Sequence, residues 1–166
     1  MDILKTATDW AKAEVFSSSF FIIFGVLFVL ASIGFWQLGR TEMAKAYIIP
    51  TLVAGVLLLI IGIGLCYTNI SRIAEFEMSY NTDVFAFVES EIERAERTLN
   101  EYKNVVFTAI PIIISICALI IIFVKTPIWR ASMITAISML VVILLVDGTA
   151  HARMHTYNKQ LELVEK

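Results

Sequence analysis

Asp147, His151 and His155 are the residues whose types and spacing most resemble a chemical site. They follow one another at intervals of four, so a helix would carry all three on one face. Two histidines at this spacing can bind a divalent metal with Asp147 as a third ligand, and histidine also titrates near neutral pH. A metal-dependent membrane enzyme and a pH sensor are therefore two hypotheses. Because the spacing is common and the chain has only 2 histidines, we instead expect no metal, no cofactor and no catalytic residue.

A second pattern is a polar stripe in an otherwise apolar segment. Its members recur at helical spacing and are Asn104, Thr108, Pro111 and Ser115. A helix surrounded by lipid has no use for such a stripe, so we expect it to face protein or water. Interhelical hydrogen bonding and the lining of a pore are the two interpretations. Pro111 also interrupts the backbone hydrogen bonds and provides a hinge.

A third pattern consists of small residues on one face of an apolar segment. We expect them to form a packing seam, in which helix backbones approach closely, made of Thr51, Gly55, Gly62 and Cys66. A phosphate-binding loop is excluded because Gly62 and Gly64 lie within an apolar run. Cys66 and Cys117 also lie in apolar runs and are neither paired nor clustered in the sequence.

These residues lie in a chain that is too apolar for a soluble domain. Of its 166 residues, 58% are hydrophobic, and the mean hydropathy is +0.80. About 20 apolar residues in a helix cross the hydrocarbon of a bilayer. Four segments meet this requirement, at residues 16–38, 46–70, 105–124 and 127–146. The sequence therefore predicts an all-α, multi-pass membrane protein.

The connections between these segments predict their arrangement. Short links at 39–45 and 125–126 force antiparallel neighbours, so we expect a four-helix up-down transmembrane bundle. Nine Lys and Arg residues lie in the termini and the central segment, against four on the opposite side, three in the short links and Arg130 in the first turn of the fourth segment. This count favours both termini and the central segment in the cytosol, and we expect a bacterial inner (plasma) membrane.

Residues 71–103 and 148–166 continue beyond the spans as amphipathic helices. We predict a helical hairpin that turns at 81–83, followed by a return helix. Together with the C-terminal helix it would form a cytosolic coiled stalk. The expected stalk seam consists of Phe85, Val88, Ile92, Leu99, Met154, Tyr157 and Leu161. We expect the acidic residues between them, such as Glu91 and Glu93, to lie on a solvated face.

Residues 1–15 carry apolar side chains at helical spacing and basic residues elsewhere on the wheel. This pattern is typical of an amphipathic helix that lies in the membrane interface. The predicted organisation is thus an interfacial helix at 1–15, spans one and two within 16–70, a hairpin at 71–103, spans three and four within 104–147, and a C-terminal helix at 148–166.

For function, the leading hypothesis is a homo-oligomeric, cation-favouring membrane pore or ion channel that is gated through its stalk. A single bundle of this size is too small to enclose a water path, so a pore requires several copies. By analogy alone, small bacterial membrane effectors of antiviral defence systems are built in this way. The alternative is a non-conducting scaffold, accessory subunit or immunity protein. Expected partners are the lipid bilayer, further copies of the chain and a cytosolic protein or ligand at the stalk, and no nucleic acid.

Overall fold

The computed structural model describes residues 3–165, and every element in this range is helical. Met1, Asp2 and Lys166, at the ends of the predicted terminal segments, lie outside the described residues. The elements follow one another as α1 (Ile3–Leu38), α2 (Glu42–Ala46), α3 (Ile48–Thr82), α4 (Val84–Glu101), the π-helix η1 (Tyr102–Ala109), α5 (Ile110–Phe123) and α6 (Pro127–Glu165).

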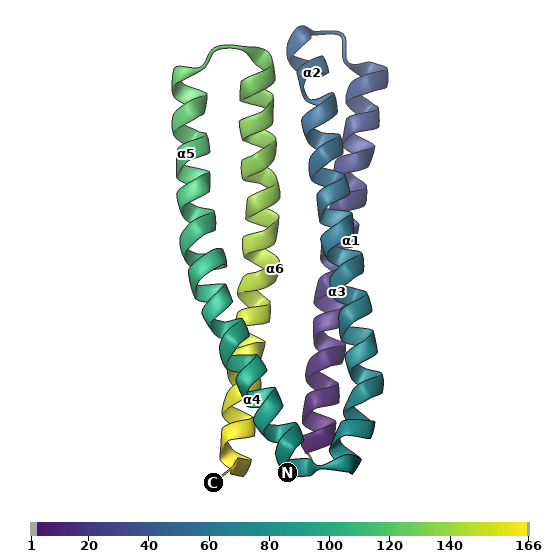
Figure 1. Cartoon of the computed structure of the whole chain (residues 1–166). Coiled ribbons are helices and arrows are strands. Elements are labelled where there is room, and N and C mark those ends of the chain that lie inside the picture. The colour runs from purple at the N-terminus through teal and green to yellow at the C-terminus, as the bar shows by residue number, and fades with distance from the viewer. Residues whose placement is uncertain (1–2, 166) are drawn as a thin grey trace.

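Four helices in the described part of the chain are long and apolar enough to cross a membrane. This is consistent with a multi-pass membrane protein. The 36 residues of α1 extend for about 54 Å at ~1.5 Å per residue, whereas the hydrocarbon core of a bilayer is about 30 Å thick. The helices therefore reach well beyond one face of a bilayer, and Figure 1 shows both chain ends and the α3–α4 turn together at that end.

The turn between α3 and α4 follows from local capping chemistry. α3 ends at Thr82 and α4 begins at Val84, with Asp83 between them in an extended conformation. The Asp83 carboxylate accepts a hydrogen bond of 3.1 Å from the Ala86 N–H, which satisfies one of the unpaired donors at the start of α4. The chain reverses at the position that the sequence indicated.

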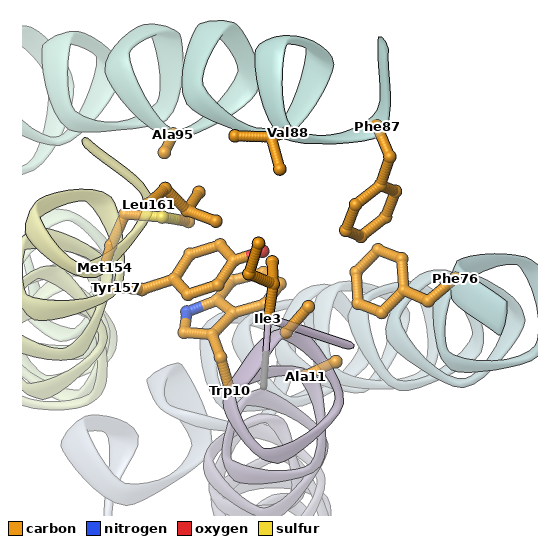
Figure 2. Close-up of a cluster of buried hydrophobic side chains, with 11 residues drawn as sticks. Ile3, Trp10, Ala11, Phe76, Phe87, Val88, Ala95, Met154, Tyr157 and Leu161 are labelled. Carbon is orange, nitrogen blue, oxygen red and sulfur yellow. The ribbon is translucent and has the colours of Figure 1, made fainter. Parts of the chain in front are cut away.

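At this end of the molecule, which we call the stalk, four helical stretches pack together. They are the first part of α1, the last parts of α3 and α6, and α4. Their shared core contains buried side chains from all four stretches, including Trp10, Phe76, Phe87 and Tyr157 (Figure 2). The stalk is therefore a four-helix assembly and not the predicted set of three extensions.

The predicted interfacial helix at 1–15 is wrong. α1 runs without interruption from Ile3 to Leu38, so the N-terminal stretch continues the first span. Its apolar face, with Ile3, Ala7 and Ala11, is buried in the stalk core. The amphipathic pattern was real, but the apolar face is covered by protein.

The other half of the molecule, which we call the membrane half, is less compact. The helices are antiparallel neighbours, as the short links require, but they do not form a closed bundle. α1 and α3 pack tightly together, α6 contacts both of them, and α5 packs on α6. Among the described residues α5 makes no contact with α1 or α3. Figure 1 shows the resulting layer, in which α5 is one edge, α6 lies in the middle and the α1–α3 pair is the other edge.

Candidate functional site

The polar stripe lies on the outer face of α5 and the adjoining π-helix. Each of Asn104, Thr108 and Ser115 is exposed and lies two positions before a buried residue, respectively Val106, Ile110 and Cys117. Two residues turn a helix by ~200°, so the polar and buried positions are on opposite sides. Because α5 packs on α6, the stripe faces away from the rest of the protomer. Pro111 is exposed on the same side.

Two members of the stripe have hydrogen bonds within their own helix. The Thr108 hydroxyl donates to the Lys103 carbonyl at 2.8 Å, and the Ser115 hydroxyl donates to the Pro111 carbonyl at 2.8 Å. These bonds use the hydroxyl protons and leave oxygen lone pairs on the outer surface. The stripe can therefore accept hydrogen bonds from water, from a hydrated ion or from another helix.

The small residues of α3 lie against α1. Thr51, Gly55 and Gly62 are buried and Cys66 is partly buried. A Cβ atom added at Gly55 would lie 2.8 Å from Val29 Cγ2 and 2.9 Å from the Gly25 carbonyl oxygen. At such distances the two backbones cannot keep their present separation, so glycine is required here.

Polar side chains also connect α1 and α3. The Ser32 hydroxyl donates to the Ile48 carbonyl at 2.7 Å, and the Cys66 thiol donates to the Val15 carbonyl at 3.7 Å. In an apolar surrounding such bonds satisfy groups that water does not reach. The α1–α3 pair thus behaves as one rigid unit of the membrane half.

The predicted stalk seam is largely buried but contains one error. Val88, Met154, Tyr157 and Leu161 belong to the buried core, and Ile92 and Leu99 pack against it. Phe85 is 86% exposed, so its assignment to the seam is wrong. Phe87 occupies the core instead, with its ring 5.5 Å from that of Phe76. The first turn of α4 is set by the Asp83 cap, and this places Phe87, not Phe85, on the inner face.

A buried polar cluster lies within the stalk core. Glu91 on α4 is 6% exposed, and Arg94 binds it through Nε at 2.9 Å and also through Nη2. The Tyr157 hydroxyl of α6 donates to Glu91 Oε2 at 2.7 Å. The expectation of a solvated Glu91 is therefore wrong. A charge at this depth is tolerated because its partners satisfy it.

Aromatic rings cover this ion pair. The guanidinium of Arg94 lies 4.5 Å from the Trp10 ring centroid, and Trp10 stacks on Tyr157 at 5.0 Å. Burial disfavours the charged form of Arg94, but Glu91 outweighs it and raises the pKa of Arg94 above its usual value. Burial and the Glu91 charge raise the pKa of Tyr157. The cluster is therefore a charged arginine, a carboxylate and a neutral phenol that hold α1, α4 and α6 together.

A second ion pair lies where the stalk meets the first span. Glu14 of α1 is 8% exposed, and Arg153 of α6 donates to it from Nε at 3.1 Å. Burial raises the pKa of the Glu14 carboxyl, and the positive charge of Arg153 offsets part of this increase. The pair joins α1, at the start of the chain, to α6, at its end, and opposes sliding of one helix along the other.

Sequence reasoning missed most of this cluster. Trp10 and Glu14 were hidden in a segment assigned to the membrane surface, and Glu91 in a row of acidic residues. One signal was present. Glu91 lies three residues after Val88 and four before Ala95, which is the spacing of the seam itself. A carboxylate at a seam position indicates a buried partner.

Asp147, His151 and His155 do not form a metal centre. Within residues 3–165, no group of three or more His, Cys, Asp or Glu side chains is placed to hold a metal ion. The His151 ring instead lies edge-on to Tyr102 and Phe107, at centroid distances of 5.7 and 5.0 Å. His151 is therefore a packing residue between α6 and the π-helix.

Comparisons with protein-family models, with curated proteins and with solved structures gave no match. The functional argument therefore depends on the geometry of the chain itself.

Proposed function

We propose that several copies of this chain assemble around a membrane pore whose wall is formed by α5. The observation that carries the proposal is the position of the polar stripe. It lies on the one span that contacts only one other span, and it faces away from that contact. In an isolated protomer this edge would face lipid. Around a central axis it would face a shared aqueous path.

The opposite edge of the layer supports this orientation. The outer positions of α1 and α3 are large and apolar, and they are exposed in the protomer, as at Ile23, Leu30, Ile60 and Ile63. Such an edge is suited to hydrocarbon. The α5 edge also exposes apolar side chains such as Ile116, and it differs by carrying the polar stripe. This stripe would direct α5 toward the axis and the α1–α3 pair toward lipid.

The stalk would stand at one mouth of the pore. The exposed face of α4 carries Glu89, Glu93, Glu96 and Glu101. A ring of such faces would raise the local concentration of cations, so the pore would favour cations. The distribution of Lys and Arg favours a cytosolic stalk and cytosolic termini, where a protein or ligand would bind the stalk and gate the pore.

A non-conducting scaffold, accessory subunit or immunity protein is the second candidate, and one observation favours it. The Thr108 and Ser115 hydroxyls already have backbone partners, which lowers the cost of placing them against apolar neighbours. The outer edge of α5 would then bind a helix of another membrane protein. In this case the purified chain would be monomeric or would not conduct.

The test combines two measurements on the purified full chain in the same preparation: oligomer mass in mild detergent and conductance in planar bilayers. We expect a discrete oligomer that conducts. Ser115→Trp should block conduction and preserve the oligomer, because the indole would fill the lumen.

The matched control is Ile60→Trp on the apolar edge, where Ile60 is 62% exposed. This variant should conduct normally. The scaffold proposal would be favoured over the pore if the purified chain is monomeric. It would also be favoured if the oligomer does not conduct, either as the full chain or after truncation at Thr149. Equal block by both tryptophans would show that α5 does not line the path.

A further inference from the structure

We propose that η1 is a one-residue register switch that turns α5 about its own axis. The switch concerns the regulation of α5, and its consequence for conduction rests on the proposed pore.

The hydrogen bonds of η1 define the extra residue. The Ile110 N–H bonds to the Val105 carbonyl, and the Thr108 hydroxyl bonds to the Lys103 carbonyl. Both bonds span five residues, whereas α-helical backbone bonds span four. A π segment inside an α-helix is equivalent to one inserted residue, and such segments are rare. Here it joins the stalk helix α4 to the span α5, where the continuous ribbon bends in Figure 1.

Pro111 explains why the π form is accessible. Proline has no N–H, so an α-helix through this position would leave the Phe107 carbonyl without its usual partner. The missing N–H costs one bond in either form, but in the α form the proline ring also collides with the Phe107 carbonyl, and this clash disfavours the α form. Phe107 lies within η1, and Pro111 is the second residue of α5.

The geometric consequence is simple. Conversion of η1 from a π-helix to an α-helix takes the extra residue into the regular helix. It rotates α5 about its own axis by ~100° relative to α4. Each position of α5 is then taken by the preceding residue. Ile114 replaces Ser115 on the outer face, and Ile116 replaces Cys117 against α6.

This rotation would remove the hydroxyl of Ser115, the one polar side chain of α5, from the outer face and put Ile114 in its place. Apart from Pro111 and Ser115, the residues of α5 are Ile, Leu, Phe, Ala or Cys. An isoleucine face toward a narrow lumen excludes water and stops ions, whereas the observed register presents the stripe. The π form would be the open register and the α form the closed one.

The attachments of the two flanking helices differ in a way that permits the rotation. α4 is fixed by Phe87, Val88, Glu91 and Ala95 in the stalk core. α5 has only Ile110 and Cys117 buried, and both would be replaced by other apolar residues, Ala109 and Ile116. His151 of α6 contacts Tyr102 and Phe107, which are both within η1, so movement of α6 in the stalk would reach the switch directly.

The first test asks whether η1 holds an extra residue and does not depend on conduction. Deletion of Val105, which is 54% exposed, should remove it, leave both flanking helices in register and preserve thermal stability in detergent. Deletion of Glu93, an exposed residue of the regular helix α4 that lies between the buried Glu91 and Ala95, should turn the two halves of the stalk seam out of register and lower the melting temperature strongly. If both deletions lower the melting temperature equally, or if neither lowers it, the proposed switch is wrong.

The second test measures the register by disulfide formation between copies in membranes, in a Cys66→Ala, Cys117→Ala background. Ser115→Cys reports the observed register and Ile114→Cys the turned one. Pro111→Ala removes the clash with the Phe107 carbonyl, which opposes the α form, and should raise the yield of Ile114→Cys relative to Ser115→Cys by at least about fivefold. Deletion of Val105 should suppress Ile114→Cys.

The outcomes separate the two proposals. If Ser115→Cys crosslinks, and neither Pro111→Ala nor deletion of Val105 alters the ratio of the two crosslink yields, the switch is wrong and the assembly around α5 stands. If neither cysteine crosslinks in any background, the assembly is wrong, while the deletion pair still decides whether η1 holds an extra residue.

Discussion

The stalk and the membrane half are built from the same long helices, but only the stalk is closed. In the stalk, four stretches surround a continuous core of apolar, aromatic and paired charged side chains. In the membrane half the second core has four buried members, namely Phe21, Leu58, Val142 and Val146. α5 is outside it. The protomer is therefore fixed at the stalk, and it presents an uncovered edge in the membrane half.

The two solvents that a multi-pass membrane protein of this kind would meet account for the difference. In water, apolar stripes drive helices to close around a core. In lipid that force is absent, and helices associate through close backbone contact and hydrogen bonds. The α1–α3 pair has glycines and hydroxyls for this purpose, whereas α5 buries only two side chains, Ile110 and Cys117.

The largest effect is expected in the stalk core. Phe87→Ala should lower stability by ~3–5 kcal/mol because it removes a buried ring and leaves a cavity. Phe85→Ala, on the same helix but at an 86% exposed position, should change stability by less than ~0.5 kcal/mol. Thermal unfolding in detergent measures both. If the two variants lose similar amounts of stability, Phe85 belongs to the seam and the first turn of α4 is oriented differently.

The next largest effect is expected where α1 and α3 pack tightly together in the membrane half. Gly55→Ala should destabilise by ~1–3 kcal/mol, because the new methyl group meets Val29 and the Gly25 backbone at under 3 Å. Gly64→Ala has nothing within 4 Å of its Cβ. It should be neutral or stabilise by up to ~1 kcal/mol through helix propensity. Thermal stability in detergent is again the measurement, and a destabilising Gly64→Ala would place a neighbour on that face of α3.

The junction between the two regions should respond to pH. Arg153→Met leaves the buried Glu14 carboxylate without its partner and should cost ~1–3 kcal/mol at pH 7. The pKa of Glu14 is already raised in the folded protein. A raised carboxyl pKa stabilises the fold most at low pH, and this contribution is lost as pH rises from the ordinary value through the raised one.

It follows that the cost of Arg153→Met should shrink as the solution is acidified from about pH 8 to about pH 5. The control is Arg153→Met combined with Glu14→Gln, which lacks the Glu14 carboxyl and should recover less. Asp147, whose pKa burial and the Glu14 charge raise to about 6, is present in both variants, so the difference between the two curves reports Glu14. Melting temperatures of the two variants across this range provide the comparison. Parallel curves would assign the pH response to another group.

The same contrast explains what the sequence could predict. Four long apolar segments, the turn at Asp83 and the seam positions on α6 follow from hydropathy, capping chemistry and helical spacing, which are local. Trp10, Glu14 and Glu91 were misassigned because an amphipathic helix has the same pattern whether its apolar face meets lipid headgroups or other helices. Likewise, the open edge at α5 depends on how helices pair in space, and no spacing along the chain records that.

The smallest effect on stability is expected at the edge that carries the proposed function. Ser115→Ala removes a hydroxyl that bonds only to its own helix, at the Pro111 carbonyl. Since the side chain is exposed and touches no other span of the protomer, the melting temperature of detergent-solubilised monomer should move by less than the equivalent of ~0.5 kcal/mol. Cys117→Ser is the matched comparison, because it places a hydroxyl on the buried side of the same helix and should destabilise more. If Ser115→Ala destabilises the monomer as much as Cys117→Ser does, the polar stripe is a packing surface within the protomer. α5 would then have to lie deeper in the layer than the edge it occupies here. A neutral Ser115→Ala means that the stripe contributes nothing to the folding of one copy, and its polarity must then be explained by what the edge meets outside the protomer.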